Sequence, residues 1–189
     1  MASDKQRIPP LPAAENTGWL RELLEAWGVP PTAPVPGIFA TLARHPELLR
    51  RWDALQRSLL LDGTLPERDR ELLILRVAHH CGASYIWDAH ADRHAPAAGL
   101  SEQEITRAAE GPGADGWRPF DIVLLRAADE LHARSSIEEQ TWIALRERYN
   151  ERQLIELTVV VGEYHLMSFV VNALGIQSEP DREAPSGAR

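Results

Sequence analysis

The segment of residues 66–81 is the feature that most constrains how this chain can fold. Pro66 suits the first turn of a helix, and the acidic Glu67 that follows favours the positive end of the helix dipole. Residues 72–78 read Leu-Leu-Ile-Leu-Arg-Val-Ala, so apolar side chains point in nearly every direction. Such a helix must be buried on all sides, in the core or against another subunit.

Helical periodicity dominates the rest of the chain, and no segment shows convincing strand alternation. We predict further helices at 17–27, 39–60 (with a restart at 45–46), 84–96, 101–110, 119–133, 136–148 and 151–174. The sequence therefore predicts an all-α fold with one domain at 15–179, a flexible N-terminal segment at 1–14 and a flexible C-terminal tail at 180–189.

A weak internal repeat relates two of the predicted helices. Residues 70–80 overlay on residues 155–165, which matches Glu71 with Glu156 and His80 with His165. The alternative is that two buried helices merely share a composition.

Composition limits the partners that this chain can have. The 189 residues carry a formal net charge of -8, whereas nucleic acid and anionic membranes attract clustered positive charge. We expect neither partner. No apolar stretch reaches the ~18 residues of a membrane span, and residues 1–18 do not resemble a signal peptide. We expect a cytoplasmic protein.

Glu71 is the first candidate for chemistry. It shares a helix face with Leu75 and Ala78, and apolar surroundings raise the pKa of a carboxyl group, so Glu71 is a candidate proton carrier near neutral pH. The alternative is a carboxylate near a helix start that pairs with Arg68 or with an arginine of a partner subunit.

The histidines form a second group of candidates. His90 lies one turn after Ile86 and Trp87 and one turn before His94. Imidazole can pass a proton in either direction near neutral pH, although a lone helical histidine is more often packed or at the surface. The spacing does not match a compact zinc signature, so we predict no metal site among His79, His80, His90 and His94.

Cys81 is the single cysteine, which excludes an internal disulfide. It follows two histidines and is a candidate reactive thiol, but a buried structural thiol is the favoured interpretation. No Gly-rich nucleotide motif and no nucleophile elbow occurs, and we expect no cofactor.

Several segments together resemble one family. They are 36–49 (PGIFATLARHPELL), 65–78 (LPERDRELLILRVA), 85–90 (YIWDAH), 98–101 (AGLS) and 172–175 (NALG). They resemble the carboxymuconolactone decarboxylase superfamily, which also contains alkylhydroperoxidase D-like thiol peroxidases, over roughly residues 11–180. The resemblance implies an alkylhydroperoxidase D-like helical bundle that forms trimers or hexamers, with sites near the subunit contacts.

The same resemblance separates two branches of chemistry. The redox branch uses a glutamate, then Cys-x-x-Cys, then a histidine. Aligned from Glu71, those cysteine positions fall on Ala83 and Ile86, and the histidine falls on His90. Both thiols are therefore missing. The pattern Tyr85-x-Trp87-x-x-His90 is instead similar to the decarboxylase-like branch, except that Ile86 replaces an acid.

We therefore expect a cofactor-independent, lyase-like enzyme that transfers protons on a small carboxylated or carbonyl compound, by decarboxylation, isomerisation or hydration. His90 would be the acid/base and Glu71 its relay or orienting partner. Two alternatives stay open: a peroxiredoxin-like thiol oxidoreductase that relies on Cys81 alone, and a non-catalytic ligand-binding or assembly protein.

We expect a homo-oligomer, preferably a trimer or hexamer. The expected substrate-binding residues are Tyr85, Trp87, His79, His80 and His94.

Overall fold

The computed structural model describes residues 6–12, 15 and 18–177. The predicted tail at 180–189 and half of the predicted segment at 1–14 lie outside these residues. The prediction of an all-α fold is confirmed, since the described residues form helices and no strands. The α-helices are α1 (Gly18–Ala26), α2 (Gly37–Leu42), α3 (Pro46–Leu60), α4 (Glu67–His80), α5 (Ser84–Ala89), α6 (Ala95–Ala97), α7 (Glu102–Glu110), α8 (Pro119–Arg134), α9 (Glu139–Arg146) and α10 (Glu151–Leu174), and a π-helix spans His90–His94.

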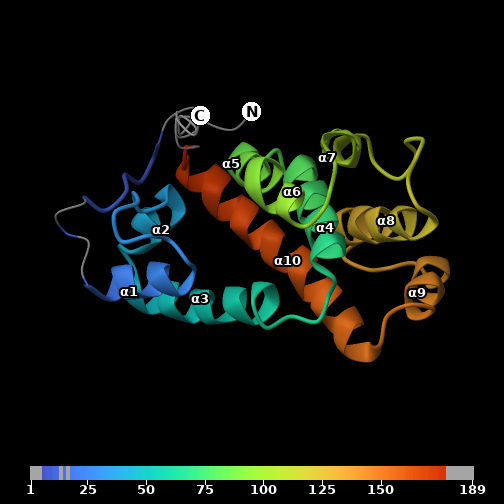
Figure 1. Ribbon diagram of the computed structural model, residues 1–189, viewed down its shortest axis with the longest axis horizontal. Coiled ribbons are helices and arrows are strands. Elements are labelled where there is room, and N and C mark those ends of the chain that lie inside the picture. The colour runs from blue at the N-terminus through green and yellow to red at the C-terminus, as the bar shows by residue number, and fades with distance from the viewer. Residues whose placement is uncertain (1–5, 13–14, 16–17, 178–189) are drawn as a thin grey trace, which may run out of the picture.

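Two long helices organise the bundle. In Figure 1, α10 runs across the middle of the molecule, between α1–α3 on one side and α4–α8 on the other. The residues of α4 from Asp69 to Ala78 are all buried, as the apolar sequence of this segment predicts. Because α4 packs against α7, α8 and α10, its side chains and those of α10 can meet at shared sites.

Helix α10 is the one helix among the described residues that is long and apolar enough to cross a membrane. Half of the most apolar 18-residue stretch of this helix is buried inside the bundle. Its central place between α4 and α3 accounts for the apolar sequence, because a core helix needs apolar residues on several faces.

Local sequence explains where several helices begin. Ser101 and Glu104 form the predicted capping box at the start of α7. Pro46 opens α3, which confirms the predicted restart within residues 39–60. The continuous helix predicted at 84–96 is wrong in detail, because residues 90–94 form a π-helix between α5 and α6. A π-helical turn has no simple sequence signal and often occurs at functional sites.

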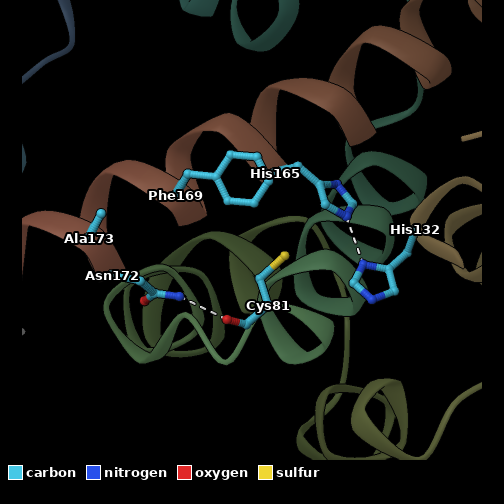
Figure 2. Close-up of a pocket in the computed structure, with 6 residues that line it drawn as sticks. All are labelled: Cys81, His132, His165, Phe169, Asn172 and Ala173. Atoms are coloured by element: carbon cyan, nitrogen blue, oxygen red, sulfur yellow. Dashed lines mark hydrogen bonds between the residues drawn. The ribbon is translucent and has the colours of Figure 1, made fainter. Parts of the chain in front are cut away.

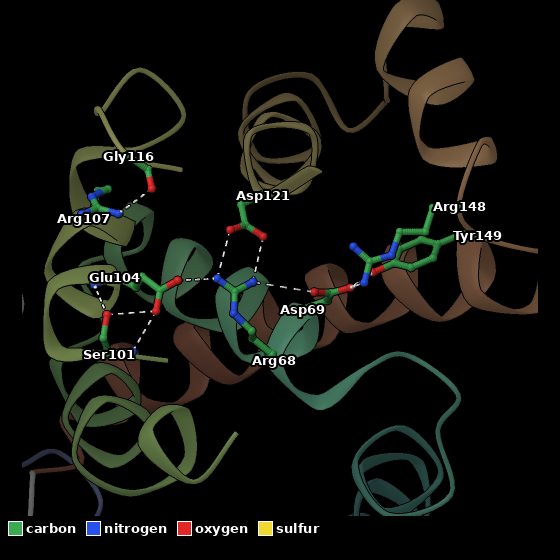
Figure 3. Close-up of polar contacts among 9 residues, drawn as sticks. All are labelled: Arg68, Asp69, Ser101, Glu104, Arg107, Gly116, Asp121, Arg148 and Tyr149. Atoms are coloured by element: carbon green, nitrogen blue, oxygen red, sulfur yellow. Dashed lines mark hydrogen bonds and ion pairs between the residues drawn. The ribbon is translucent and has the colours of Figure 1, made fainter. Parts of the chain in front are cut away.

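Ion pairs fix the start of α4 to the neighbouring helices (Figure 3). The Arg68 guanidinium donates to both carboxylate oxygens of Asp121 on α8, at 2.8 and 3.0 Å, and to Glu104 on α7 at 2.6 Å. The next residue, Asp69, accepts a hydrogen bond of 2.7 Å from the Tyr149 hydroxyl. Arg68 and Asp69, which lie three and two residues before Glu71, thus join the start of α4 to several other parts of the bundle and help to fix the position of Glu71.

Candidate functional site

Glu71 and His90 form a buried pair between α4 and the π-helix. Nδ1 of His90 lies 2.6 Å from Oε2 of Glu71, and the two residues are 8% and 3% exposed. A carboxylate can only accept, so Nδ1–H is the donor and the neutral ring carries its lone pair on Nε2. The alternative pairing of Glu71 with Arg68 is wrong, because Arg68 binds Asp121 and Glu104 instead.

Tyr164 of α10 completes this arrangement. Its hydroxyl lies 3.2 Å from Nε2 of His90 and donates to that nitrogen, with the two rings edge to face. Burial raises the pKa of Tyr164 well above 10, so the phenol stays protonated and remains a donor. Sequence analysis missed Tyr164, although it lies within the weak repeat at 155–165.

Two further side chains, His94 and Arg70, border the pair. The His94 ring lies 4.8 Å from that of His90, between centroids, and desolvation together with the charge of His90 lowers the pKa of His94, although part of its side chain reaches solvent. Arg70 is 8% exposed, and its Nε is buried without a hydrogen-bond partner among the described residues. The nearest acid to this nitrogen is Glu71, whose Oε1 lies 3.8 Å away.

The other expected substrate-binding residues make different contacts. The Tyr85 hydroxyl accepts a hydrogen bond from the backbone nitrogen of Ile38 at 3.3 Å. The Trp87 ring lies 6.2 Å from the exposed His79, and Nε2 of His80 lies 2.6 Å from Asp129. Of the five predicted substrate-binding residues, His94 has a ring contact to His90.

A second cluster surrounds Cys81 at a pocket of about 460 Å³ (Figure 2). Cys81 is half-buried, packs against the main apolar core and lines the pocket, so the thiol is less buried than the favoured interpretation expects. Nδ1 of His132 lies 2.9 Å from Nε2 of His165, and hydrogen bonding with the Cys81 side chain raises the pKa of His165. His132 and His165 were not among the predicted site residues, because they come from α8 and α10, far from Cys81 in the sequence.

Comparison with known proteins finds a family model that matches the middle of the chain. Residues 46–130, which contain both Glu71 and His90, match the model of the carboxymuconolactone decarboxylase family. This segment is similar to the carboxymuconolactone decarboxylase family, and the fold of the chain is that of alkylhydroperoxidase D-like proteins. No curated protein matches the sequence.

Several solved structures share this fold at low sequence identity. An alkylhydroperoxidase D core protein of Ralstonia eutropha JMP134, described as an uncharacterized peroxidase-related protein, has 22% identity and a TM-score of 0.79, over 92% of both chains. A peroxidase-related protein of Silicibacter sp. TM1040 has 19% identity and a TM-score of 0.73, over 94% of this chain and 90% of its own. The apo debrominase Bmp8 has 16% identity and a TM-score of 0.72, over 94% of both chains.

Within the carboxymuconolactone decarboxylase framework, the positions that the resemblance assigns to cysteines are Ala83 and Ile86. Both are 1% exposed and belong to the main apolar core. Neither offers a group that exchanges electrons or protons. The chemistry that this part of the chain can perform therefore depends on Glu71, His90 and their neighbours.

Proposed function

We propose that this protein is a carboxymuconolactone decarboxylase-like enzyme that transfers protons on a small carboxylated or carbonyl compound without a cofactor. The reaction would be a decarboxylation, isomerisation or hydration. The observation that carries the proposal is the 2.6 Å contact between Glu71 and His90, both of them buried. A carboxylate that fixes an imidazole in one tautomer is an arrangement suited to general acid–base catalysis.

His90 would exchange the proton through Nε2. Glu71 accepts from Nδ1–H, so Nε2 holds the lone pair that removes a proton from carbon, and the carboxylate stabilises the imidazolium that results. In an isomerisation, the same imidazolium returns the proton to a different atom of the enolate. In a decarboxylation, the substrate carboxylate leaves as carbon dioxide, protonated His90 donates its proton to the carbon of the resulting enolate, and water then reprotonates His90. The Tyr164 hydroxyl, 3.2 Å from Nε2, would donate to the enolate oxygen while remaining a phenol.

Arg70 supports a carboxylated substrate. A buried guanidinium whose Nε has no hydrogen-bond partner is costly, and a carboxylate is the ligand that best matches its fork of donors. Nε of Arg70 lies 3.8 Å from Oε1 of Glu71, so Arg70 lies beside the acid–base pair. Arg70 would therefore bind the carboxylate while His90 acts on the adjacent carbon.

The thiol alternative would use a different place in the fold. Cys81 lines the pocket with His165 and is the only cysteine in the sequence, so a peroxidase cycle would need an external thiol to resolve each turnover. Replacement Cys81→Ser separates the two functions: proton transfer survives it, whereas thiol chemistry does not.

Proton transfer can be tested without knowing the natural substrate. A panel of small lactone acids and enones is incubated with the protein in deuterated water, and deuterium at carbons beside the carbonyl group is followed by proton NMR. Glu71→Gln and His90→Gln should each slow exchange by about 100-fold or more, the usual range for loss of a general acid–base group. Arg70→Met should mainly raise KM for the carboxylated members of the panel.

Glu67→Gln is the matched control, because it makes the same carboxylate-to-amide change as Glu71→Gln on an exposed residue of α4. It should leave exchange unchanged. Wild-type exchange rates in Glu71→Gln and His90→Gln would refute the proposal. Ligand binding that both variants retain, with no turnover by the wild type, would favour the non-catalytic alternative.

A further inference from the structure

We propose that Cys81, His132 and His165 form a zinc site that is separate from the acid–base pair. The three residues come from the C-terminal end of α4, the last turn of α8 and the middle of α10. The sulfur and one nitrogen of each ring all lie within 4.8 Å of one another. Figure 2 shows the side chains of Cys81 and His165 converging from opposite sides of the pocket, with His132 beside His165.

The His165 ring is already oriented as a ligand. Its Nδ1 lies 2.7 Å from the backbone oxygen of Val161, so Nδ1 carries the hydrogen and Nε2 has the free lone pair. Metal-binding histidines commonly donate their second nitrogen to a carbonyl or carboxylate in this way. Nε2 is also the atom that faces Nδ1 of His132, at 2.9 Å.

The His132 ring is supported by a second row of side chains. It stacks on His80, with centroids 4.4 Å apart and planes inclined by 9°. His80 is held by Asp129 at 2.6 Å, and Asp129 in turn receives two hydrogen bonds from Arg76, at 2.6 and 3.1 Å. This series fixes the plane of His132, and it occupies Nε2 of His80, so His80 supports the site rather than binding the metal.

The donor set selects the type of metal. One thiol sulfur and two imidazole nitrogens suit zinc and similar borderline ions, whereas magnesium and calcium prefer oxygen. Without metal, His132 Nδ1–H donates to His165 Nε2. When zinc binds Nδ1 of His132, the hydrogen of that ring moves to Nε2, and zinc takes the place of the thiol hydrogen of Cys81, so binding releases one proton and no electron is transferred.

Three protein ligands leave one coordination position open. The pocket provides space for it, and its remaining lining residues are Phe169, Asn172 and Ala173. The Asn172 amide donates to the backbone oxygen of Cys81 at 2.8 Å, which fixes the end of α4 at the pocket wall. The geometry is that of zinc sites with a water molecule or small ligand in the fourth position, rather than of closed structural sites.

The site does not depend on the proposed acid–base function. Tyr164 and His165 are neighbours on α10 but point to different groups, Tyr164 to His90 and His165 to His132. Loss of the zinc site would therefore leave the Glu71–His90 pair intact, and the reverse also holds.

Zinc binding to the full-length, chelator-treated protein tests the proposal directly. Isothermal titration should show one zinc ion per chain, with proton release that scales with the buffer. Cobalt added in place of zinc should give tetrahedral ligand-field bands and a sulfur-to-cobalt charge-transfer band. Cys81→Ser should abolish the charge-transfer band, and both Cys81→Ser and His165→Gln should weaken zinc binding by at least 10-fold.

His79→Gln is the control, since His79 is adjacent to His80 but lies outside the cluster. It should bind zinc as the wild type does. Circular dichroism checks that each variant folds, and zinc should raise the Tm of the wild type and His79→Gln but not of Cys81→Ser. Wild-type affinity in both cluster variants, or equal weakening by His79→Gln, would overturn the proposal.

Discussion

The hydroxyl of Tyr164 lies 3.2 Å from Nε2 of His90, while Nδ1 of the same ring lies 2.6 Å from Glu71. The imidazole is thus held at both nitrogens by two groups with opposite preferences, one that only accepts and one that donates. Glu71 comes from α4, His90 from the π-helix and Tyr164 from α10, so three separate segments define one proton-transfer direction.

The tautomer of His90 is the first prediction. When the ring is neutral, its hydrogen should be on Nδ1, because Glu71 accepts there and Tyr164 donates to Nε2. Long-range nitrogen–proton correlation NMR distinguishes the two ring nitrogens, and His90→Gln assigns the signals. Tyr164→Phe should leave the hydrogen on Nδ1. A hydrogen on Nε2 in the wild type would contradict the arrangement.

The Arg68 ion pairs should contribute strongly to stability. The side chains of Arg68 and Asp121 are 14% and 2% exposed, so Arg68→Met leaves a buried carboxylate without its cation. We expect a loss of about 3–5 kcal/mol in the free energy of unfolding, measured by urea denaturation. Arg134→Met is the control: the pair of Arg134 with Glu138 is exposed, and its loss should cost less than about 1 kcal/mol.

Acid should destabilise the protein through Glu104. Burial alone would raise the pKa of Glu104, but hydrogen bonds from Ser101 and Arg68 outweigh it and lower the pKa from 4.5 to about 2. A carboxyl whose pKa is lower in the folded state stabilises fully above its unfolded value, and that contribution is lost as pH falls from 4.5 towards 2. Urea midpoints across this range should fall less in Glu104→Gln than in the wild type. The exposed Glu102 provides a control, and Glu102→Gln should follow the wild type.

Self-association should involve α10. Ile155, Val159, Leu166 and Phe169 are 65%, 36%, 46% and 64% exposed. Their spacing of four, seven and three residues matches the core positions of a heptad pattern, so they form one apolar stripe along the helix. We propose that a second copy covers this stripe in a homo-oligomer, preferably a trimer or hexamer. Phe169 also lines the Cys81 pocket, so the interface would help to close it.

Light scattering after size exclusion measures that assembly. The wild type should be at least a dimer at micromolar concentration, and Phe169→Glu should reduce its mass. Ile143→Glu changes an equally exposed apolar residue on α9, away from the stripe, and should keep the wild-type mass. A monomeric wild type would exclude the oligomer.

The residues that the weak internal repeat matches have different contacts in the structure. It equates Glu71 with Glu156, but Glu71 binds His90, whereas Glu156 accepts hydrogen bonds from the backbone of Thr64 and Leu65. His80 and His165, the second matched pair, lie on either side of His132. Sequence similarity places these residues at equivalent positions on their helices, yet the partner of each depends on which helix packs opposite.

Three consecutive residues of α10 contact three different parts of the fold. Glu163 accepts hydrogen bonds from Trp52 and Gln56 of α3, Tyr164 binds His90, and His165 binds His132 of α8. Burial raises the pKa of Glu163. Successive helical side chains point about 100° apart, so this short segment contacts α3, the π-helix and α8.

Sequence by itself determined the helices, their main boundaries and the burial of α4, because apolar periodicity, prolines and capping residues act within a few residues of one another. It also marked Glu71 and His90. Tertiary structure decided that Tyr164 completes that pair and that Cys81 meets His132 and His165. These contacts join residues between 33 and 84 positions apart. Only the packing of α4, α8 and α10 brings such residues together. This packing depends on many weak side-chain contacts spread over the whole core.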